Sequence, residues 1–383
     1  MKIKLLYITN IPALYRQKRF NTMAKIFPEY GIDFEVLYMA RTEPNRKWII
    51  PHDSYQYKHA FFKGIHPTIG GFFAHFNPGL LLRLLKNDYN IAIVGGMASP
   101  THWFAPFFIN SKKKQVMSVE SNLHSVERTK GFGAWMKKIL LGKADVYQIT
   151  GNPQIEYIKF FNPESSSKQF IRMPNLIDED IFVDQVSAKR IEKLSLRRQL
   201  GVNENTQLWV LPARLIEIKG ILPFLALMKG IENVKLFILG DGPLQAEIED
   251  FVKQNKLPVI CVGFVQQDTI VDYYAAADLF VLPSIKDPSP LSPIEAIASG
   301  LPVLVSSRIG NLEDVLKKDF NGWAYDPITE MEEGREIVKE IAALPIQKLS
   351  EMGNASKNRY FEFFDTKRCI ALYAEQITKI FNS

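Results

Sequence analysis

Four charged residues in the second half of the sequence have types and spacings that suit a ligand with both phosphate and hydroxyl groups. Asp287 and Glu295 lie eight positions apart, and Arg214 and Lys219 lie five positions apart. Carboxylates accept hydrogen bonds from hydroxyls, whereas a guanidinium and an ammonium can together neutralise a diphosphate. Each cation within about 4 Å of a phosphate oxygen would contribute roughly 1–4 kcal/mol, which could stabilise a departing diphosphate without a metal.

Each of these residues also has a purely structural interpretation. The Ser-x-x-Glu pattern that ends at Glu295 fits a helix capping box, in which the carboxylate would only satisfy a backbone amide. Asp287 precedes a proline, and such an aspartate commonly begins a turn. Arg214 and Lys219, taken alone, could be a solvated surface pair. Taken residue by residue, the sequence leaves these alternatives open.

The elements around these residues favour the ligand-binding interpretation. Apolar runs predict one buried strand at 207–212, just before Arg214, and another at 279–283, just before Asp287. A helix is predicted to begin at Pro293 and to end near Gly300. The charged residues would therefore follow the carboxyl ends of strands, where open α/β sheets bind ligands. Amides at the start of a helix suit a phosphate.

Short apolar strands alternate with helical segments along the whole chain, as in a parallel sheet with helices on both faces. In the first half, the predicted strands lie near 2–9, 33–39, 57–62, 90–95, 114–119, 145–149 and 168–172. In the second half, they lie near 207–212, 235–240, 258–263, 279–283 and 302–306. The predicted fold class is therefore α/β, with two Rossmann-like, doubly wound domains.

Composition limits the classes of function that are open to this chain. Its 383 residues are 46% hydrophobic and 23% charged, which is typical of a soluble globular protein with two domains. The net charge of +6 suits anionic ligands or an anionic membrane surface, and no nucleic-acid partner is expected because no RNA-binding signature is present. Two cysteines and the lack of a long apolar stretch predict a cytoplasmic protein, with attachment at the inner face of the cell membrane as a further option.

Several of these segments resemble the motifs of one enzyme family. Asp287 and Glu295 resemble the acid-x7-acid signature of the family 4 glycosyltransferases, also called glycosyl transferases group 1, which have the GT-B fold. The first acid is Asp where Glu is usual, and Pro and Ser replace the usual glycines between the acids. The segment at 213–220 resembles the family's Gly-Arg-x4-Lys-Gly motif, with Ala213 in place of the first glycine. The segments at 240–243 and 263–264 resemble a Gly-x-Gly-Pro turn and the segment that usually lies along the base.

This resemblance implies two Rossmann-like domains that face each other across a cleft. Residues 1–180 would bind the acceptor, residues 188–365 would bind the nucleotide sugar, and residues 366–383 would form a helix that packs back on the first domain. The segment at 174–178 resembles the Pro-Asn-Gly-(Val/Ile)-Asp element that ends the first domain, although Pro and Asn also cluster in ordinary turns. A charged helix is predicted after it, from 188 to 198.

The resemblance also implies an activity, which is the retaining, metal-independent transfer of a hexose or related sugar. The donor would be a nucleotide diphosphate sugar, UDP-linked, used as substrate rather than cofactor. The acceptor would be a glycan or a lipid-linked saccharide, as in the assembly of a cell-surface polysaccharide. Arg214 and Lys219 would neutralise the diphosphate, Glu295 would hold ribose hydroxyls, and Asp287 would hydrogen-bond the transferred sugar. Further donor contacts are predicted at Gly242, Phe264, Leu291 and Ser292.

On the acceptor side, the resemblance points to loops at the ends of strands in the first half. Asn10 and Arg16 follow the first strand, Gly96 lies in a glycine-bearing loop after the strand at 90–95, and Glu120 ends the strand at 114–119. Glu120 could orient or deprotonate the incoming hydroxyl as a catalytic residue, or it could simply reach solvent. Arg16 is unfavourable near a helix start, so it should have a partner, either a phosphate or a neighbouring carboxylate.

Other residues in the first half have structural alternatives. His102 and His124 lie near these loops, and each is more often a surface or helix residue than a base. Trp135 with Lys137 and Lys138 suits the membrane interface, although most such stripes are core-facing helices.

Two rival functions share the predicted architecture. A sugar-nucleotide 2-epimerase would act on a UDP-sugar without an acceptor, and a catalytically silent partner subunit would keep the fold without binding a donor. A nicotinamide-dependent oxidoreductase is disfavoured, because no strand is followed by Gly-x-Gly-x-x-Gly with an acidic residue about twenty positions further on.

Overall fold

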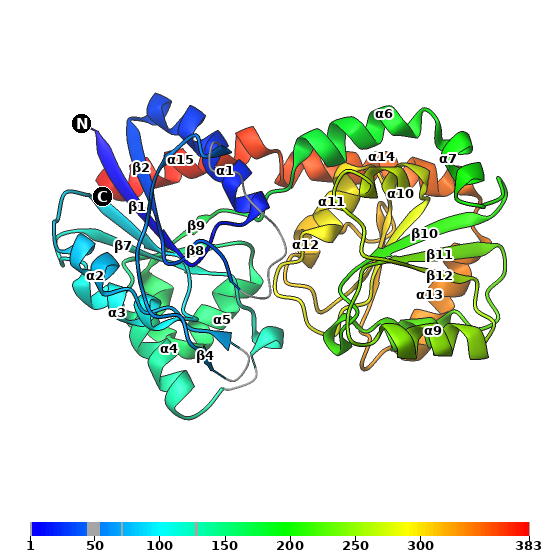
Figure 1. Ribbon diagram of the computed structural model, residues 1–383, viewed down its shortest axis with the longest axis horizontal. Helices are drawn as coiled ribbons and strands as arrows, with labels where there is room; N and C mark the ends of the chain where they lie inside the picture. Colours follow the sequence, from blue (N-terminus) through cyan, green and yellow to red (C-terminus); the bar gives the residue numbers. More distant parts are fainter. Residues whose placement is uncertain (1, 44–53, 70–71, 127–128, 383) are drawn as a thin grey trace. The chain divides into compact units, whose positions relative to one another are not determined.

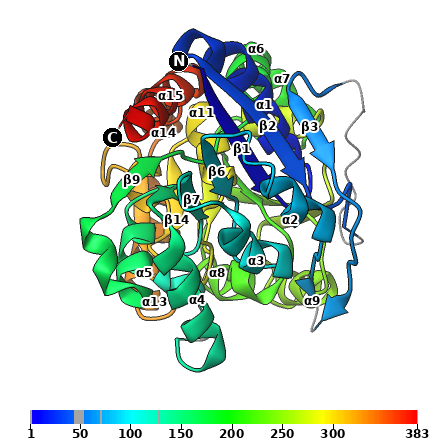
Figure 2. The same ribbon diagram turned by 90° about the vertical axis from the view of Figure 1, so that its left-hand side faces the viewer.

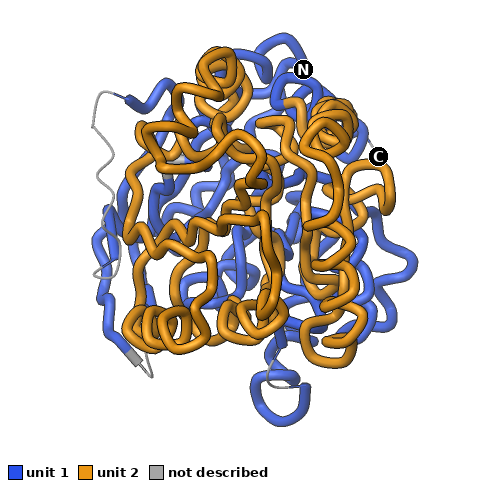
Figure 3. Tube along the Cα trace, turned by 90° about the vertical axis from the view of Figure 1, so that its right-hand side faces the viewer, with its two compact units in different colours: residues 1–176, 366–383 blue, residues 177–365 orange. Residues whose placement is uncertain are grey.

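The computed structural model describes residues 2–43, 54–69, 72–126 and 129–382 (Figure 1). The chain forms two compact units, one of Met1–Leu176 with Thr366–Ser383 and the other of Ile177–Asp365 (Figure 3). Each unit is built around its own parallel sheet, with seven strands in the first and six in the second. The predicted α/β fold class with two doubly wound sheets is therefore confirmed.

The first unit contains all seven strands that were predicted for this half of the chain. They are β1 (Ile3–Thr9), β2 (Ile32–Tyr38), β3 (Lys58–Phe61), β6 (Ile91–Val94), β7 (Lys114–Val119), β8 (Val146–Ile149) and β9 (Gln169–Arg172). Their order in the sheet is β3-β2-β1-β6-β7-β8-β9. The order changes direction between β1 and β6, and such a switch point is where doubly wound sheets bind ligands. A short hairpin, β4 (Thr68–Ile69) with β5 (Phe72–Phe73), was not predicted.

Alternate residues of each strand point to opposite faces of the first sheet, so two cores form. Leu5 and Tyr7 belong to the core under α1 (Leu14–Ile26) and α15 (Thr366–Asn382). Leu6 and Ile8 belong to the core on the other face. The helices on that face are α2 (Pro78–Leu84), α3 (Pro100–Phe108), α4 (Phe132–Lys143) and α5 (Pro153–Phe161) (Figure 2). Short 3-10 turns are η1 (Phe27–Tyr30), η3 (Leu123–Ser125) and η4 (Pro163–Ser167).

The last helix of the chain completes the core of the first unit. The buried Tyr373 hydroxyl of α15 donates to Gln148 Oε1 at 2.5 Å, and Gln148 Nε2 donates to the Tyr7 hydroxyl at 3.2 Å. These bonds satisfy polar groups inside an otherwise apolar layer, where unpaired groups would be costly. The ring of Tyr373 also stacks on Phe27, with centroids 6.3 Å apart.

The second unit contains the five predicted strands and one more. They are β10 (Gln207–Pro212), β11 (Val234–Leu239), β12 (Val259–Gly263), β13 (Leu279–Leu282), β14 (Val303–Ser306) and β15 (Gly322–Tyr325). Their order is β12-β11-β10-β13-β14-β15, and all neighbouring strands pair in parallel. β15 has only four residues and begins with a glycine, which weakens the sequence signal for a strand.

Helices cover both faces of the second sheet. They are α6 (Val186–Arg190), α7 (Lys193–Gln199), α8 (Ile221–Leu227), α9 (Gln245–Gln254), α10 (Ile270–Ala276), α11 (Ser292–Ala298), α12 (Leu312–Val315), α13 (Met331–Ala343) and α14 (Ile346–Phe363). A π-helical segment (Asp180–Gln185) precedes α6, and the 3-10 turn η6 (Glu217–Lys219) precedes α8.

The single charged helix predicted at 188–198 is wrong, because a turn at 191–192 divides it into α6 and α7. Arginines on the two helices are anchored separately. Arg190 donates to the Tyr274 carbonyl at 2.9 Å, and Arg197 donates to the buried Asp278 at 2.7 Å. These bonds to residues distant in the sequence hold α6 and α7 in place as two separate helices.

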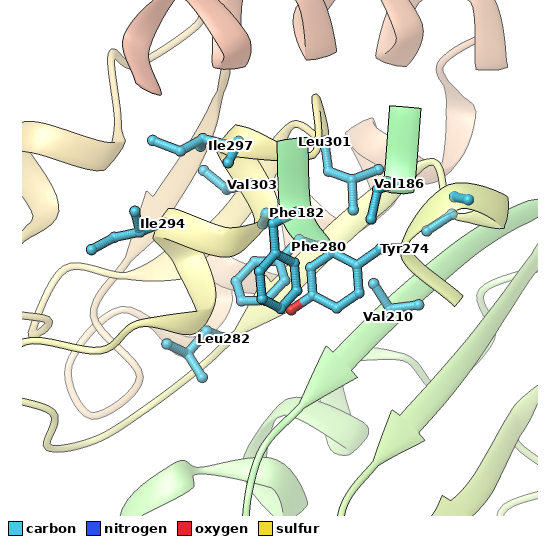
Figure 4. Packing of buried hydrophobic residues seen from close by; sticks show 14 of the residues in the cluster. Phe182, Val186, Val210, Tyr274, Phe280, Leu282, Ile294, Ile297, Leu301 and Val303 are labelled. Atoms are coloured by element: carbon cyan, nitrogen blue, oxygen red, sulfur yellow. The ribbon is translucent and has the colours of Figure 1, made fainter. Parts of the chain in front are cut away.

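One apolar core fixes α11, the helix that follows β13. Ile294 and Ile297 of α11 are fully buried against Tyr274, Phe280 and their neighbours (Figure 4). The ring of Tyr274 meets Phe182 edge-on, with centroids 5.3 Å apart. Burial of each large apolar side chain contributes about 1.5–3 kcal/mol, so the position of α11 is strongly determined.

Candidate functional site

The four charged residues of the second unit lie at its switch point. β10 and β13 are neighbours in the sheet, and the later strands of the chain are added outward from them in opposite directions, β11 and β12 beside β10 and β14 and β15 beside β13. The loop after β10 carries Arg214 and Lys219, and the loop after β13 carries Asp287 and leads into Glu295. Parallel strands end at one edge of a sheet, so these residues occupy neighbouring loops at the edge where such sheets bind ligands.

Backbone contacts join these two loops. The amides of Ile285 and Lys286 both donate to the carbonyl of Ile218, at 2.9 and 3.3 Å. Gly220 has φ of 63°, and a Cβ at this position would lie 2.3 Å from the carbonyl oxygen of Pro283. Only glycine tolerates both the left-handed backbone and this approach. The glycine after Lys219 therefore holds that lysine against the loop after β13.

Lys219 and Asp287 form an ion pair with each other. The Lys219 ammonium donates to Asp287 Oδ2, and the two side chains are only 16% and 12% exposed. A pair in this setting is screened less by salt than a pair on the open surface. The Asp287 backbone is also fixed, because its carbonyl accepts from the Gly310 amide at 3.0 Å. The predicted phosphate-binding cation and the predicted sugar-binding acid are thus brought together.

Arg214 is exposed on the loop after β10. Its side chain forms no hydrogen bond or ion pair with any residue in the described parts of the chain. Arg308, by contrast, is paired with Asp326 at 2.7 Å, and this bond is the main cause that lowers the pKa of Asp326 to about 2. Arg214 therefore has its full donor capacity available for a ligand.

Glu295 is not part of a capping box. α11 begins at Ser292, and its N-cap residue, Leu291, has no side-chain cap bond. Glu295 is part-exposed, and its Oε2 accepts a long hydrogen bond from the Tyr274 hydroxyl at 3.5 Å. Burial raises the pKa of Glu295 to about 7, the Tyr274 bond acts against this, and the charge of Asp178 adds to it. The carboxyl is thus only partly ionised near neutral pH.

The glycine turn after β11 supports the loop of Arg214. A Cβ on Gly240 would lie 2.0 Å from the Ala213 carbonyl oxygen, and a Cβ on Gly242 would lie 2.5 Å from that of Leu215. The Leu215 amide donates to the Asp241 carbonyl at 2.9 Å. Both glycines are therefore required by the close approach of two backbones.

The remaining predicted donor residues lie at the same edge. Phe264 follows β12 and is 57% exposed. Leu291 and Ser292 are part-exposed at the start of α11. The first amides of a helix have no acceptor within the helix, so this end is able to bind an anion.

Three of the predicted acceptor residues meet at the switch point of the first unit. Arg16 donates from Nη1 to Thr9 Oγ1 at 3.0 Å and to Asn10 Oδ1 at 3.2 Å. Its Nη2 lies 3.3 Å from Glu120 Oε1. Of the two partners considered for Arg16, the carboxylate is thus the one present. Gly96 lies on the adjacent loop, after β6, beside the ring of His102.

Sequence reasoning missed several residues around these clusters. Tyr274, the partner of Glu295, lies in an apolar helical run that marked it only as core. Glu43 accepts from Asn10 Nδ2 at 3.1 Å, and its Oε1 lies 3.0 Å from His75 Nε2. His102 was predicted to be a surface or helix residue; it lies on a helix, as one of these alternatives had it, but it is buried, with 3% exposed.

The described residues lack two kinds of feature, a metal-binding cluster and a membrane-spanning helix. They contain no group of three or more His, Cys, Asp or Glu side chains that could hold a metal ion. None of their helices combines the length and the apolar composition that a membrane-spanning segment needs.

Residues 192–359 match the family model described as glycosyl transferases group 1. An uncharacterized glycosyltransferase of Methanocaldococcus jannaschii is 36% identical over 140 residues, which is 35% of this chain and 36% of that protein. The alpha-monoglucosyldiacylglycerol synthase of Acholeplasma laidlawii is 26% identical over 197 residues, which is 48% of each protein. The chain thus covers less than half of the length of these two relatives.

Solved structures resemble the chain over its whole length. The Anabaena protein HepE in complex with UDP has a TM-score of 0.71 at 19% identity, over 99% of this chain and 100% of that chain. Its complex with UDP-glucose has a TM-score of 0.66 at 17% identity, over 98% and 100%. A glycosyltransferase of Rickettsia africae has a TM-score of 0.71 at 14% identity, over 100% and 99%. This chain therefore has the GT-B fold, and its residues 192–359 are similar to the glycosyl transferases group 1 family.

Proposed function

We propose that this protein is a retaining glycosyltransferase that moves a hexose or related sugar from a UDP-sugar to a glycan or lipid-linked saccharide. The observation that carries the proposal is the Lys219–Asp287 pair at the switch point of a group 1 domain. A cation and an acid held together there match a ligand in which a phosphate adjoins a sugar. Arg214 and Glu295 lie on the same two chain segments.

The two cations have the role of stabilising the leaving diphosphate. Arg214 offers a planar fork of donors, and Lys219 offers a mobile point charge. The amides of Leu291 and Ser292, at the positive end of α11, donate to further phosphate oxygens. These charges face the place where negative charge develops, so they lower the barrier without a metal.

The two acids have the role of holding hydroxyl groups. When Lys219 turns to the diphosphate, Asp287 is released to accept hydrogen bonds from the transferred sugar. Glu295, once ionised, accepts from the ribose hydroxyls, and Phe264 places an exposed ring beside the base. UDP is the first nucleotide to test, because a protein of this fold has been solved with UDP and with UDP-glucose.

The acceptor binds to the first unit in this proposal. The Glu120 side chain is 38% exposed, so it can reach an incoming hydroxyl and take its proton. Arg16 and Asn10 fix the position of Glu120 through their shared hydrogen bonds. Gly96 would let the acceptor approach the backbone closely. A lipid-linked acceptor is a suitable class to test, since one relative is named as an alpha-monoglucosyldiacylglycerol synthase.

The helix α4 gives the protein a surface for peripheral membrane contact at the cytoplasmic face. Phe132 and Trp135 are 72% and 56% exposed, and their ring centroids lie 5.6 Å apart. The core-facing alternative for this stripe is therefore wrong for these two rings. Lys130 and Lys138 are exposed beside them. Exposed aromatic rings next to lysines match the headgroup region of an anionic bilayer.

The proposed function is tested by screening nucleotide sugars for a rise in melting temperature, followed by transfer assays with the donors that bind. A bound ligand stabilises the fold by mass action, so UDP and UDP-sugars should raise the melting temperature and nucleotides with other bases should not. If no nucleotide sugar binds, the silent-subunit alternative replaces this proposal. If a UDP-sugar is converted without any acceptor, the epimerase alternative does.

A further inference from the structure

A buried histidine in the first unit has unmet hydrogen-bonding capacity. His102 lies in the first turn of α3 and is 3% exposed. Neither Nδ1 nor Nε2 has a hydrogen-bond partner among the described residues. Buried polar atoms are nearly always paired, because an unpaired one loses its bonds to water without replacement. A pair of such atoms on one ring therefore calls for a specific explanation.

The ring of His102 lies at the switch point of the first sheet. The loop after β6 connects to β1 through the Gly95 amide, which donates to the Ile8 carbonyl at 2.8 Å. Gly96, in the same loop, has φ of 146°, and a Cβ on it would lie 3.6 Å from His102 Cε1. Residues 95–97 are part-exposed, so the loop beside the ring lies at the surface. This is the position at which doubly wound sheets bind ligands.

The surrounding polar groups already have partners. Arg16 binds Thr9, Asn10 and Glu120, and His75 binds Glu43. The carbonyl of His75 accepts from the Thr101 amide at 3.0 Å, which ties this cluster to the start of α3. His102 differs from these neighbours in that both nitrogens of its ring lack a partner among the described residues.

The charge state of His102 limits the ligands that it can bind. Burial lowers the pKa of His102 to about 3, and the nearby His75 and Arg16 add to this effect. A neutral imidazole donates at one nitrogen and accepts at the other. A hydroxyl group can also do both, whereas an ionised phosphate can only accept. A sugar hydroxyl can therefore pair with either nitrogen of the ring, whereas an ionised phosphate could pair only with the donor nitrogen.

We propose that His102 is an acceptor-binding residue, whose ring binds a hydroxyl of the acceptor saccharide at the β1/β6 switch point. The inference rests on the proposed function, because it assumes that the first unit receives a saccharide. Since the ring is only 3% exposed, binding requires that the adjacent residues 95–97 shift. The unpaired ring is then a binding group that is prepared in advance, at a cost to stability.

The test compares His102→Phe and His102→Gln with the control His124→Gln in the full-length protein. His124 is exposed on η3 of the same unit. The acceptor probe is the methyl glycoside of glucose, galactose or N-acetylglucosamine that the parent glycosylates fastest from UDP-glucose. His102→Phe should raise the KM for this glycoside about tenfold and leave the KM for UDP-glucose within about twofold, as expected when one buried hydrogen bond is lost. The control should match the parent.

Melting temperature provides a second readout. Phenylalanine fills a similar volume without polar atoms, so His102→Phe should melt at or above the temperature of the parent. His102→Gln keeps a donor and an acceptor, so it should recover part of the acceptor affinity.

Two outcomes would overturn the inference. An unchanged KM for the glycoside in His102→Phe would remove the acceptor role. A fall in its melting temperature that His102→Gln reverses would show a structural bond, for example to a buried water. If the parent transfers no sugar to any glycoside and binds no UDP-sugar, the proposed function fails first and this inference falls with it. Donor binding by the parent therefore distinguishes the two failures.

Discussion

Lys219 and Asp287 are paired with each other across the two loops of the second switch point. The charges of the cation proposed for the diphosphate and the acid proposed for the sugar therefore neutralise each other before a donor binds. Binding must exchange this contact for contacts with the ligand, and the exchange costs less than exposing two unpaired buried charges. The pair thus keeps both side chains in place.

This relationship predicts how Asp287→Asn will act. The variant should bind UDP as well as the parent does, because UDP has no transferred sugar. It should bind UDP-glucose about tenfold more weakly, since a charge-assisted hydrogen bond to the sugar is lost. Calorimetry with both ligands gives the ratio. Asp272→Asn, which breaks a surface pair with Lys189, is the control. Equal losses for UDP and UDP-glucose would show that Asp287 does not contact the sugar.

The raised pKa of Glu295 predicts a pH-dependent stability. The pKa of its carboxyl is raised from the ordinary 4.5 to about 7 in the fold, so the folded state binds the proton more tightly. Folding is therefore penalised as the pH rises through this range, and the penalty is complete above pH 7. Glu295→Gln should stabilise the protein by about 1–3 kcal/mol at pH 8 and leave stability unchanged at pH 4.5.

Chemical denaturation at the two pH values measures this difference. The control is Glu247→Gln, an exposed residue of α9 in the same unit. A gain in stability from Glu295→Gln that is equal at both pH values would contradict the assignment of a raised pKa.

The glycine turn after β11 predicts a donor defect from a small substitution. In Gly242→Ala, the added Cβ would lie 2.5 Å from the Leu215 carbonyl oxygen, so the loop that carries Arg214 must shift. Overpacking of this kind costs about 1–3 kcal/mol, and UDP-glucose affinity should fall at least several-fold. Thermal melting and calorimetry check the two effects. Gly142→Ala has open space around its new Cβ and should change neither.

The exposed rings of α4 predict binding to anionic vesicles. The double variant Phe132→Ser/Trp135→Ser should lose most of its co-sedimentation with phosphatidylglycerol vesicles, because the buried apolar area in the bilayer is lost. The melting temperature of this variant should equal that of the parent, since both rings are exposed. Ile191→Ser removes an 88% exposed apolar side chain of the second unit and should bind like the parent. Parent protein that stays in the supernatant would refute the membrane proposal.

Much of the fold was predictable because it depends on local patterns. The buried strands are short apolar runs, and β7 and β10 were located at their observed bounds. The spacing of the charged motifs also placed Lys219 and Asp287 at one sheet edge, since parallel strands share that edge.

What could not be predicted depends on contacts between distant residues. The Ser-x-x-Glu pattern indicated a cap, yet the carboxyl of Glu295 instead meets Tyr274, 21 positions away. Arg16 pairs with Glu120, which lies 104 positions away in the sequence, and no local sequence pattern indicates this pairing. The burial of His102 follows from how α3 lies on the sheet, which a single sequence does not specify.

The measurement that tests the central claim most directly is the calorimetry of UDP-glucose binding to the parent and to Arg214→Ala/Lys219→Ala. The control is Lys189→Ala/Arg198→Ala, which removes the same two charge types from surface ion pairs of the same unit. The account predicts that the parent and the control bind alike. The site variant should lose at least about tenfold in affinity, because each charge-assisted contact is worth about 1.5–3 kcal/mol. Equal binding of UDP-glucose by the parent and the site variant would contradict the account.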